Sequence, residues 1–116
     1  MIRGTGIDII EITRIEQAIK RWGDHFLAHV FCEEEIEYAQ KHKFPSQHFA
    51  ARFAAKEAVL KAIGDNARVS WKDMKITNDK NGKPVCFYKN KKYSRKIHIS
   101  ISHTKKYAVA SAIITT

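Results

Sequence analysis

The sequence is short of the features that mark several classes of protein. It has only two cysteines, Cys32 and Cys86, and no C-x-x-C pair, so we expect free thiols and a reducing compartment, most simply the cytoplasm. Residues 1–4 contain no charged leader followed by an apolar run, and nowhere do about 18 apolar residues follow one another. We therefore expect no signal peptide, no membrane-spanning helix and no membrane partner.

Acidic residues are also scarce: 12 Asp and Glu stand against 21 Lys and Arg, which gives a net charge of +9. Such a charge attracts polyanions, whether nucleic acid, anionic lipid, an acidic protein or a phosphorylated ligand, without choosing among them. Part of the excess lies in a basic run and in a second, shorter cluster, and such runs usually form a solvated loop or hairpin rim. These residues are Lys89, Lys91, Lys92, Arg95 and Lys96, and Lys105-Lys106.

With 116 residues, 44% of them hydrophobic, and no repeat or Gly-, Pro- or Ser-rich linker, the chain predicts a single domain over residues 1–116. Its first segment, residues 2–10, has the pattern of a β-strand. Successive side chains of a strand point to opposite faces, which puts Gly4, Gly6 and Asp8 on one face and isoleucines on the other.

Helical periodicity predicts three helices in the first half of the chain. The pattern Thr13-x-x-Glu16 is a capping-box signature that opens the first helix, with Trp22 facing inward and Gly23 just past its end. The second helix has acidic residues in its first turn, where the helix dipole favours them, and the third ends at Gly64. The predicted helices cover residues 13–22, 33–42 and 45–63.

Beyond Gly64 the period of the pattern changes to two, which indicates strands. Asn81-Gly82 is a strong hairpin signal and joins a strand at 68–77 to one at 84–89. A further strand carries Ile97, Ile99 and Ile101, and the last runs from Tyr107 to Thr115. The order of elements predicts an α+β domain with three helices and an antiparallel sheet.

Two carboxylates stand where an apolar core would not place them. Asp8 lies among isoleucines, and the helical step of 100° per residue turns Glu57 inward between apolar stripes. A buried pair of carboxylates is costly unless a cation holds it, and Mg²⁺ commonly binds one or two carboxylates. The alternatives are a helical Glu57–Lys61 ion pair and a strand-end cap formed by Asp8.

Other motifs give weaker signals. Ser100-Ile101-Ser102-His103 ends a strand next to two lysines and could bind phosphate. Adjacent residues of a strand point to opposite faces, so Ser102 and His103 are poorly placed for serine hydrolysis. His25 and His29 lack the glutamate of H-E-x-x-H, and we read them as helix-end or loop histidines, with little support for zinc. Complete Rossmann and P-loop fingerprints are missing.

Four segments together resemble the short holo-(acyl carrier protein) synthases, a family of phosphopantetheinyl transferases. Each motif is weak alone, but they keep the family's order and span nearly the whole chain. They are Gly4-x-Gly6-Ile7-Asp8-Ile9 with Arg14-Ile15, Arg52-Phe53-Ala54-Ala55-Lys56-Glu57-Ala58 with Lys61-Ala62-x-Gly64, Asn81-Gly82-Lys83-Pro84, and Ser100-Ile101-Ser102-His103 with Tyr107-Ala108-x-Ala110.

The resemblance implies a 4′-phosphopantetheinyl transferase-like fold and a reaction. Asp8 and Glu57 would bind Mg²⁺ at the pyrophosphate of coenzyme A, and Lys61 would stabilise charge beside them. A serine of apo acyl carrier protein would attack the β-phosphate and release 3′,5′-ADP, with a metal-bound water or Glu57 as the base. The residues implied to contact coenzyme A are Arg52, Lys56, Lys61, Gly64, Gly82, Pro84, Ser102 and His103.

The resemblance also implies two protein partners. Helix 13–22 would bind the acidic carrier protein, and short members of the family assemble as homotrimers with each site between two subunits. The chain departs from the family after Gly64, where Asp65-Asn66 stands in place of a glycine-rich turn. The residues implied to bind the carrier are Arg14, Gln17, Ala18, Arg21 and Phe53.

Two rival readings remain from the residues themselves. A nucleic-acid module would interleave exposed aromatic residues with basic ones, whereas most aromatic residues here fall on predicted core faces. We therefore expect no nucleic-acid partner. A non-catalytic binder of acidic proteins would use helix 13–22 but would leave Asp8 and Glu57 without a purpose. The sequence leaves open which pathway the carrier serves.

Overall fold

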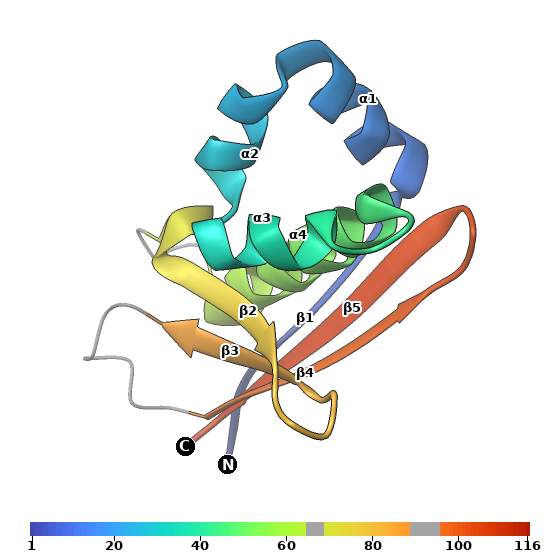
Figure 1. The fold of residues 1–116 in the computed structure, drawn as a ribbon. Coiled ribbons are helices and arrows are strands. Elements are labelled where there is room, and N and C mark those ends of the chain that lie inside the picture. Colours follow the sequence, from blue (N-terminus) through green and yellow to red (C-terminus); the bar gives the residue numbers. More distant parts are fainter. Residues whose placement is uncertain (65–68, 89–95) are drawn as a thin grey trace.

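The computed structural model describes residues 1–64, 69–88 and 96–116 of the chain (Figure 1). Strand β1 (Ile2–Glu11) is followed by the helices α1 (Ile12–Trp22), α2 (Asp24–Val30), α3 (Glu33–Gln40) and α4 (Pro45–Ile63). The second half contains the 3₁₀ turn η1 (Trp71–Asp73) and the strands β2 (Met74–Asn78), β3 (Pro84–Tyr88), β4 (Lys96–His103) and β5 (Tyr107–Thr115). The α+β class is confirmed, with four helices in the described residues where the sequence predicted three.

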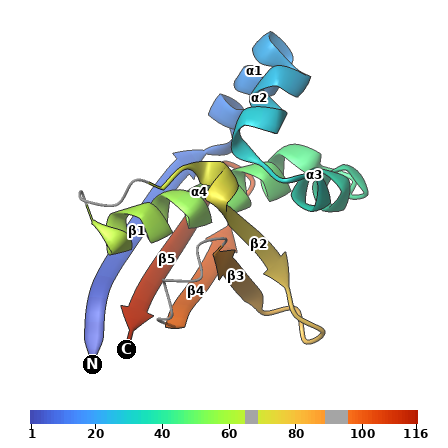
Figure 2. The same ribbon diagram turned by 90° about the vertical axis from the view of Figure 1, so that its left-hand side faces the viewer.

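The strands form two antiparallel sheets. Strand β5 lies in the middle of the larger sheet, paired with β1 on one side and with β4 on the other. Strands β2 and β3 form a separate hairpin. Figure 2 shows α4 lying across one face of the larger sheet, with α1 and α2 standing away from it. The opposite face of that sheet carries no helix in the described part of the chain.

Helix α4 approaches β1 closely because the strand offers glycines at the contact. A Cβ atom on Gly6 would overlap the carbonyl oxygen of Ala58, and one on Gly4 would overlap that of Ala62. The sequence correctly separated two faces of this strand, and the glycine face is the one that α4 covers. The other face is open, since Ile7 and Ile9 are each 65% exposed.

The apolar core has two parts that meet along α4. Small alanine side chains of α4 pack against the larger sheet and against Met74 and Ile76 of β2. The other side of α4, with Phe49, packs against residues of α1, α2 and the α2–α3 link, among them Ile15 and Phe31. Helix α4 is therefore the element shared by both halves of the core.

A buried ion pair fixes the two halves to each other. Lys56 Nζ lies 2.7 Å from Glu35 Oε1, and neither side chain is exposed. The lysine also donates to the Val30 carbonyl at 2.8 Å, and the glutamate accepts from the Ile76 N–H at 2.8 Å and the Cys32 N–H at 2.8 Å. A buried pair survives when its polar atoms are satisfied in this way, because losing either partner would leave an uncompensated charge. The pair thus joins α2, α3, α4 and β2.

Helix α1 differs from its prediction in its first residue, in its N-cap and in the exposure of Trp22. It begins at Ile12, its N-cap is Glu11 without a side-chain cap, and the Ile12 N–H donates to the Lys106 carbonyl at 2.8 Å. The predicted capping box is therefore wrong, because the neighbouring β4–β5 turn supplies the acceptor. Trp22 is 56% exposed and does not face inward. Gly23 ends the helix as predicted, with φ of 56°.

The remaining elements follow the predictions with two exceptions. Helices α3 and α4, the β2–β3 hairpin and strands β4 and β5 are confirmed. Helix α2 was missed, and residues 71–73, predicted as strand, form η1. Residues 65–68 and 89–95 lie outside the described part of the chain, and with them Asp65-Asn66 and most of the basic run.

Candidate active site

Asp8 lies on the face of β1 that α4 covers. Its carboxylate Oδ1 accepts from Lys61 Nζ at 3.2 Å, and the same ammonium donates to the Ile7 carbonyl at 2.9 Å. The Asp8 side chain is 16% exposed and that of Lys61 is 54% exposed. Asp8 pairs with Ala110 within the sheet and β1 continues to Glu11, so Asp8 is not a strand-end cap.

Glu57 lies one turn before Lys61 on the same side of α4. Its Oε1 accepts a hydrogen bond from the indole Nε1 of Trp71 at 2.6 Å. In the described chain the ion-pair partner of Lys61 is Asp8, and the alternative Glu57–Lys61 pair is not formed. Lys61 therefore reaches Asp8 from the same face of α4 that carries Glu57 one turn earlier.

Two further cations of this helix were predicted to contact phosphate, and the structure separates them from Lys61. Lys56 is fully buried with Glu35, so that prediction is wrong: this ammonium neutralises a core carboxylate and has no surface to offer a ligand. Arg52 is 4% exposed, and its guanidinium lies 4.1 Å from the Tyr38 ring centroid. Among the described residues its Nε has no hydrogen-bond partner, and burial lowers the pKa of the guanidinium.

The strand pairing sends Ser102 and His103 to different faces. Ser102 pairs with Val109 and helps to line a hollow on the open face of the sheet with Ile7. His103 follows it on the α4 side, where its ring centroid lies 6.4 Å from that of His48. The two residues therefore cannot share one proton, in agreement with the case against serine hydrolysis.

A cluster of rings lies next to His103 and was not found from the sequence. His42 and His48 stack with ring centroids 3.9 Å apart, and Tyr38 lies 4.6 Å from His42. The Nδ1 of His42 bonds to the Tyr38 carbonyl oxygen at 2.7 Å. Burial, with the nearby His42, Arg52 and His103, lowers the pKa of His48 to about 4. Residues from α3, α4 and β4 meet here only in the folded chain.

The other predicted coenzyme contacts are spread over the molecule. Gly82 has φ of 84° and sits with Pro84 at the loop of the β2–β3 hairpin, at the end of the molecule away from α1 (Figure 1). Gly64, with φ of 100°, ends α4. In the described residues no hydrogen bond or ion pair joins these positions to Asp8 or Glu57. One chain alone does not gather the predicted contacts.

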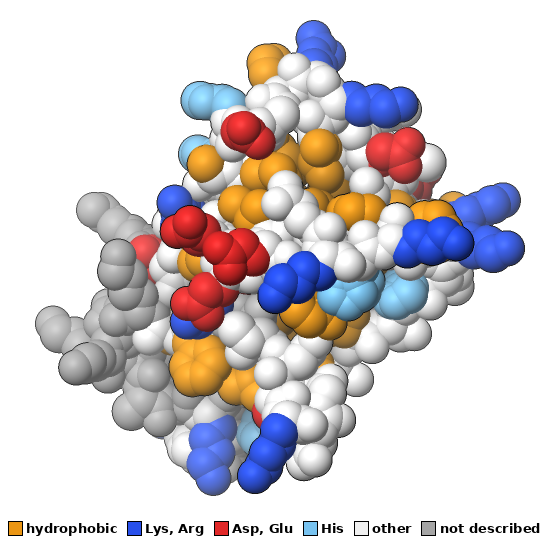
Figure 3. Space-filling model, in the orientation of Figure 1, with side chains coloured by type: hydrophobic (Ala, Val, Ile, Leu, Met, Phe, Trp, Pro, Cys, Tyr) orange, Lys and Arg blue, Asp and Glu red, His pale blue; other side chains and the backbone are white. Residues whose placement is uncertain are grey.

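The predicted carrier-binding residues lie mainly along one side of α1. Arg14, Gln17 and Arg21 are exposed, while Ala18 is half-buried. Phe53 is half-buried on α4, with its ring 5.8 Å from that of Trp71. Figure 3 shows basic side chains around the projecting helices and acidic ones gathered lower on the same view. The structure thus presents a basic ridge on α1.

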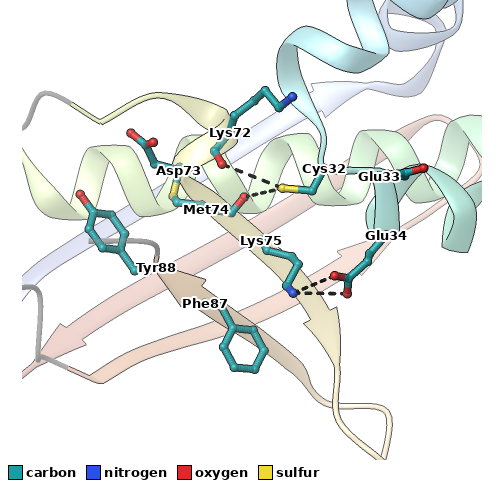
Figure 4. A pocket seen from close by; sticks show the side chains of 9 residues that line it. All are labelled: Cys32, Glu33, Glu34, Lys72, Asp73, Met74, Lys75, Phe87 and Tyr88. Carbon is teal, nitrogen blue, oxygen red and sulfur yellow. Dashed lines mark hydrogen bonds and ion pairs between the residues drawn. The ribbon is translucent and has the colours of Figure 1, made fainter. Parts of the chain in front are cut away.

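A hollow of about 450 Å³ contains no predicted site residue. It lies between the start of α3 and the β2–β3 hairpin, where Lys75 bonds to both oxygens of Glu34 at 3.1 and 3.2 Å (Figure 4). Cys32 Sγ faces the carbonyls of Lys72 and Met74 there. Lys61 instead lines a hollow of about 500 Å³ at the open face, with Ile7 and Ile113. We place the chemistry by its charged groups, Asp8, Glu57 and Lys61, of which Lys61 alone lines this second hollow.

Comparison with known proteins gives the class to which this geometry belongs. The family model described as the 4′-phosphopantetheinyl transferase superfamily matches residues 4–112. Curated holo-[acyl-carrier-protein] synthases are similar over nearly the full chain. That of Koribacter versatilis is 45% identical over 98% of both chains, and that of Thermodesulfovibrio yellowstonii is 44% identical over 99% of this chain and 100% of its own.

Solved structures agree with the sequence matches. The synthase of Bacillus anthracis, in complex with CoA (3′,5′-ADP), has a TM-score of 0.85 at 38% identity and covers 98% of this chain and 96% of its own. The synthase of Neisseria meningitidis has a TM-score of 0.90 at 30% identity, with 100% of both chains covered. The chain belongs to the holo-(acyl carrier protein) synthase family, and its predicted fold is confirmed. In its described residues no helix is long and apolar enough to cross a membrane.

The shifted pKa of His48 predicts a pH dependence of stability. In the unfolded chain His48 takes up a proton as the pH falls through 6.5, whereas in the folded chain it does so only near pH 4. The free energy of unfolding therefore falls as the pH falls through that window. If the whole pKa shift contributed, the free energy of unfolding would fall by about 2 kcal/mol between pH 6.5 and 5. Because the ring is half-exposed, we expect about half of that fall. His48→Phe should flatten this slope in urea denaturation, whereas His25→Phe, at an exposed position of α2, should keep it. Equal slopes in parent and His48→Phe would contradict the prediction.

Proposed function

We propose that this chain transfers 4′-phosphopantetheine from coenzyme A to a serine of apo acyl carrier protein. The serine Oγ bonds to the β-phosphorus, the bond from that phosphorus to the bridging pyrophosphate oxygen breaks, 3′,5′-ADP leaves, and the hydroxyl proton ends in solution. The observation that carries the proposal is the Asp8–Lys61 pair beside Glu57 in a chain that matches the synthases along its whole length. The Helicobacter pylori synthase was solved in complex with coenzyme A.

The residues at the β1–α4 contact fit Mg²⁺. In the described chain no group of three or more His, Cys, Asp and Glu side chains is arranged to hold a metal, but Mg²⁺ needs only one or two carboxylates because waters and phosphate oxygens complete its shell. Asp8 and Glu57 would hold it, and when bound it would neutralise charge on the pyrophosphate. Mg²⁺ dependence of the transfer is thus part of the proposal.

The chain's own cations complete the phosphate site. The Lys61 ammonium is half-exposed next to Asp8 and can turn from that carboxylate to a phosphate oxygen. The further proposed contacts are Arg52, whose Nε has no partner among the described residues, and His103, which is exposed at the end of β4. Gly64, Gly82, Pro84 and Ser102 remain proposed contacts as well, although they lie on different faces of one chain.

That spread supports a site shared between subunits of a homotrimer. The open face of the larger sheet exposes Ile7, Ile9 and Ile113 by 65%, 65% and 38%, an apolar surface that a second copy would cover. Ser102 is exposed on the same face, so covering it would bring one chain's Ser102 towards the other's Lys61. The assembly would unite contacts that one chain leaves apart.

The assembly proposal predicts a trimer mass in sedimentation equilibrium at micromolar concentration. Ile7→Asp, which places a charge in the centre of the apolar face, should dissociate the trimer. Trp22→Asp makes the same kind of change at an exposed aromatic residue on α1 and should leave the trimer intact. A monomeric parent with full transferase activity would rule out the shared site.

The transfer reaction is tested by mass spectrometry of an apo acyl carrier protein incubated with coenzyme A, Mg²⁺ and this chain. A phosphopantetheine adduct is expected from the enzyme and from neither rival, a nucleic-acid module or a non-catalytic binder. Glu57→Gln, which keeps the shape and the acceptor for Trp71, should lower the transfer rate by orders of magnitude and leave the metal-free protein as stable as the parent.

The same variant separates metal binding from folding. Added Mg²⁺ should raise the melting temperature of the parent but not of Glu57→Gln, since a ligand at 100 times its dissociation constant adds about 2.7 kcal/mol. Glu37→Gln, on the exposed side of α3, is the matched control and should respond like the parent. If Glu57→Gln stays active and still responds to Mg²⁺, or unfolds, Glu57 is a structural residue and the metal lies elsewhere.

The basic ridge of α1 is the proposed docking surface for the acidic carrier, with Arg14, Gln17, Ala18 and Arg21 on one side of the helix and Phe53 below. Arg14→Glu should weaken carrier binding by about 1–3 kcal/mol, mainly through slower association with a strong salt dependence. Lys20→Glu makes the same charge change on another side of α1 and should have little effect. The KM for coenzyme A should stay unchanged; equal losses for both substrates would exclude this surface.

A further inference from the structure

Trp71 makes a hydrogen bond to Glu57 that none of the sequence motifs predicted. Its indole Nε1 donates to Glu57 Oε1 at 2.6 Å, across 14 residues of sequence and from η1 to α4. Tryptophan is a donor only, so it can hold a carboxylate oxygen but cannot compete for a cation. Lys61, the basic residue best spaced to pair with Glu57, is engaged by Asp8 instead.

The indole ring is itself held in place from two sides. The His29 ring of α2 meets it edge-on, with centroids 5.7 Å apart and planes at 70°, and the Phe53 ring of α4 lies 5.8 Å away. The backbone of η1 is fixed by the Ser70 N–H, which donates to Asp73 Oδ2 at 2.9 Å. The N–H of Trp71 is therefore a directed donor on a supported ring.

From this geometry we propose that Trp71 is a positioning residue, which orients the Glu57 carboxylate for its cation by holding Oε1. The inference rests on the proposed role of Asp8 and Glu57 as the Mg²⁺ pair. A carboxylate side chain on a helix has several rotamers, and a hydrogen bond from outside the ligand set selects one of them before the metal arrives. Loss of such an outer contact typically weakens metal binding 10–100-fold.

The decisive variant is Trp71→Phe, which keeps an aromatic ring between His29 and Phe53 but removes the N–H. With Mn²⁺ as the probe, counted by the electron paramagnetic resonance of the unbound ion in the presence of coenzyme A, we expect 10–100-fold weaker binding than in the parent. His29→Ala removes a packing contact of the same indole and leaves its N–H. Because the N–H remains, it should weaken Mn²⁺ binding far less than Trp71→Phe does.

A second measurement keeps Trp71 in place and covers the case in which Trp71→Phe does not fold. The chain has two tryptophans, so Trp22→Phe leaves Trp71 as the only one. Its emission should change when Mg²⁺ binds, because the charge of the carboxylate bonded to the indole is then shared with the cation. The response should disappear when Glu57→Gln is added. A residue that only fills space would show neither effect.

The outcomes separate this inference from the proposed function. Trp71 is not a positioning residue if the parent and Trp71→Phe bind Mn²⁺ equally well. The same conclusion follows if Mg²⁺ is shown to bind but the emission of Trp71 does not change. In both cases the proposed metal site itself is retained. If the parent binds no Mn²⁺ with coenzyme A present, the metal site itself fails and this inference fails with it.

Discussion

The close contact between β1 and α4 is the constraint on which the site depends. Glycine at positions 4 and 6 lets the strand backbone rest against the carbonyls of Ala58 and Ala62. Two residues further on, the same strand face delivers Asp8 to Lys61, one helical turn from Glu57. A side chain at either glycine would push the helix away and with it the charges that face Asp8. The backbone contact therefore sets the geometry of the chemistry.

Lys56 and Lys61 belong to the same motif on α4 but have different roles. Five residues turn a helix by about 140° beyond a full revolution, so Lys56 and Lys61 leave it in different directions. Lys56 is buried against Glu35 and joins the two parts of the core, whereas Lys61 is half-exposed beside Asp8. A buried charge pair of this kind gives the helix a fixed register against α3 and β2. The ion pair therefore fixes the position of α4, the helix that carries Glu57 and Lys61, relative to the rest of the core.

Local signals in the sequence predicted the fold well, and tertiary contacts account for the errors. The Asn-Gly hairpin, the glycine after α1 and the inward turn of Asp8 depend on a few adjacent residues and were found correctly. Helix α2 has only seven residues and two buried positions, Leu27 and Val30, too few for a period to show. The burial of Lys56 and the bond from Trp71 to Glu57 depend on partners 21 and 14 residues away, which no local pattern encodes.

The central claim is that Asp8 and Glu57 hold a cation against the pyrophosphate of coenzyme A. A crystal structure with coenzyme A and Mn²⁺, read through the anomalous scattering of the manganese, tests it directly. We predict one anomalous peak between the two carboxylates, within bonding distance of both and of pyrophosphate oxygens, with Lys61 turned to the phosphate. A peak elsewhere, or coenzyme A bound in the hollow beside Cys32 with no cation at Asp8, would contradict the account.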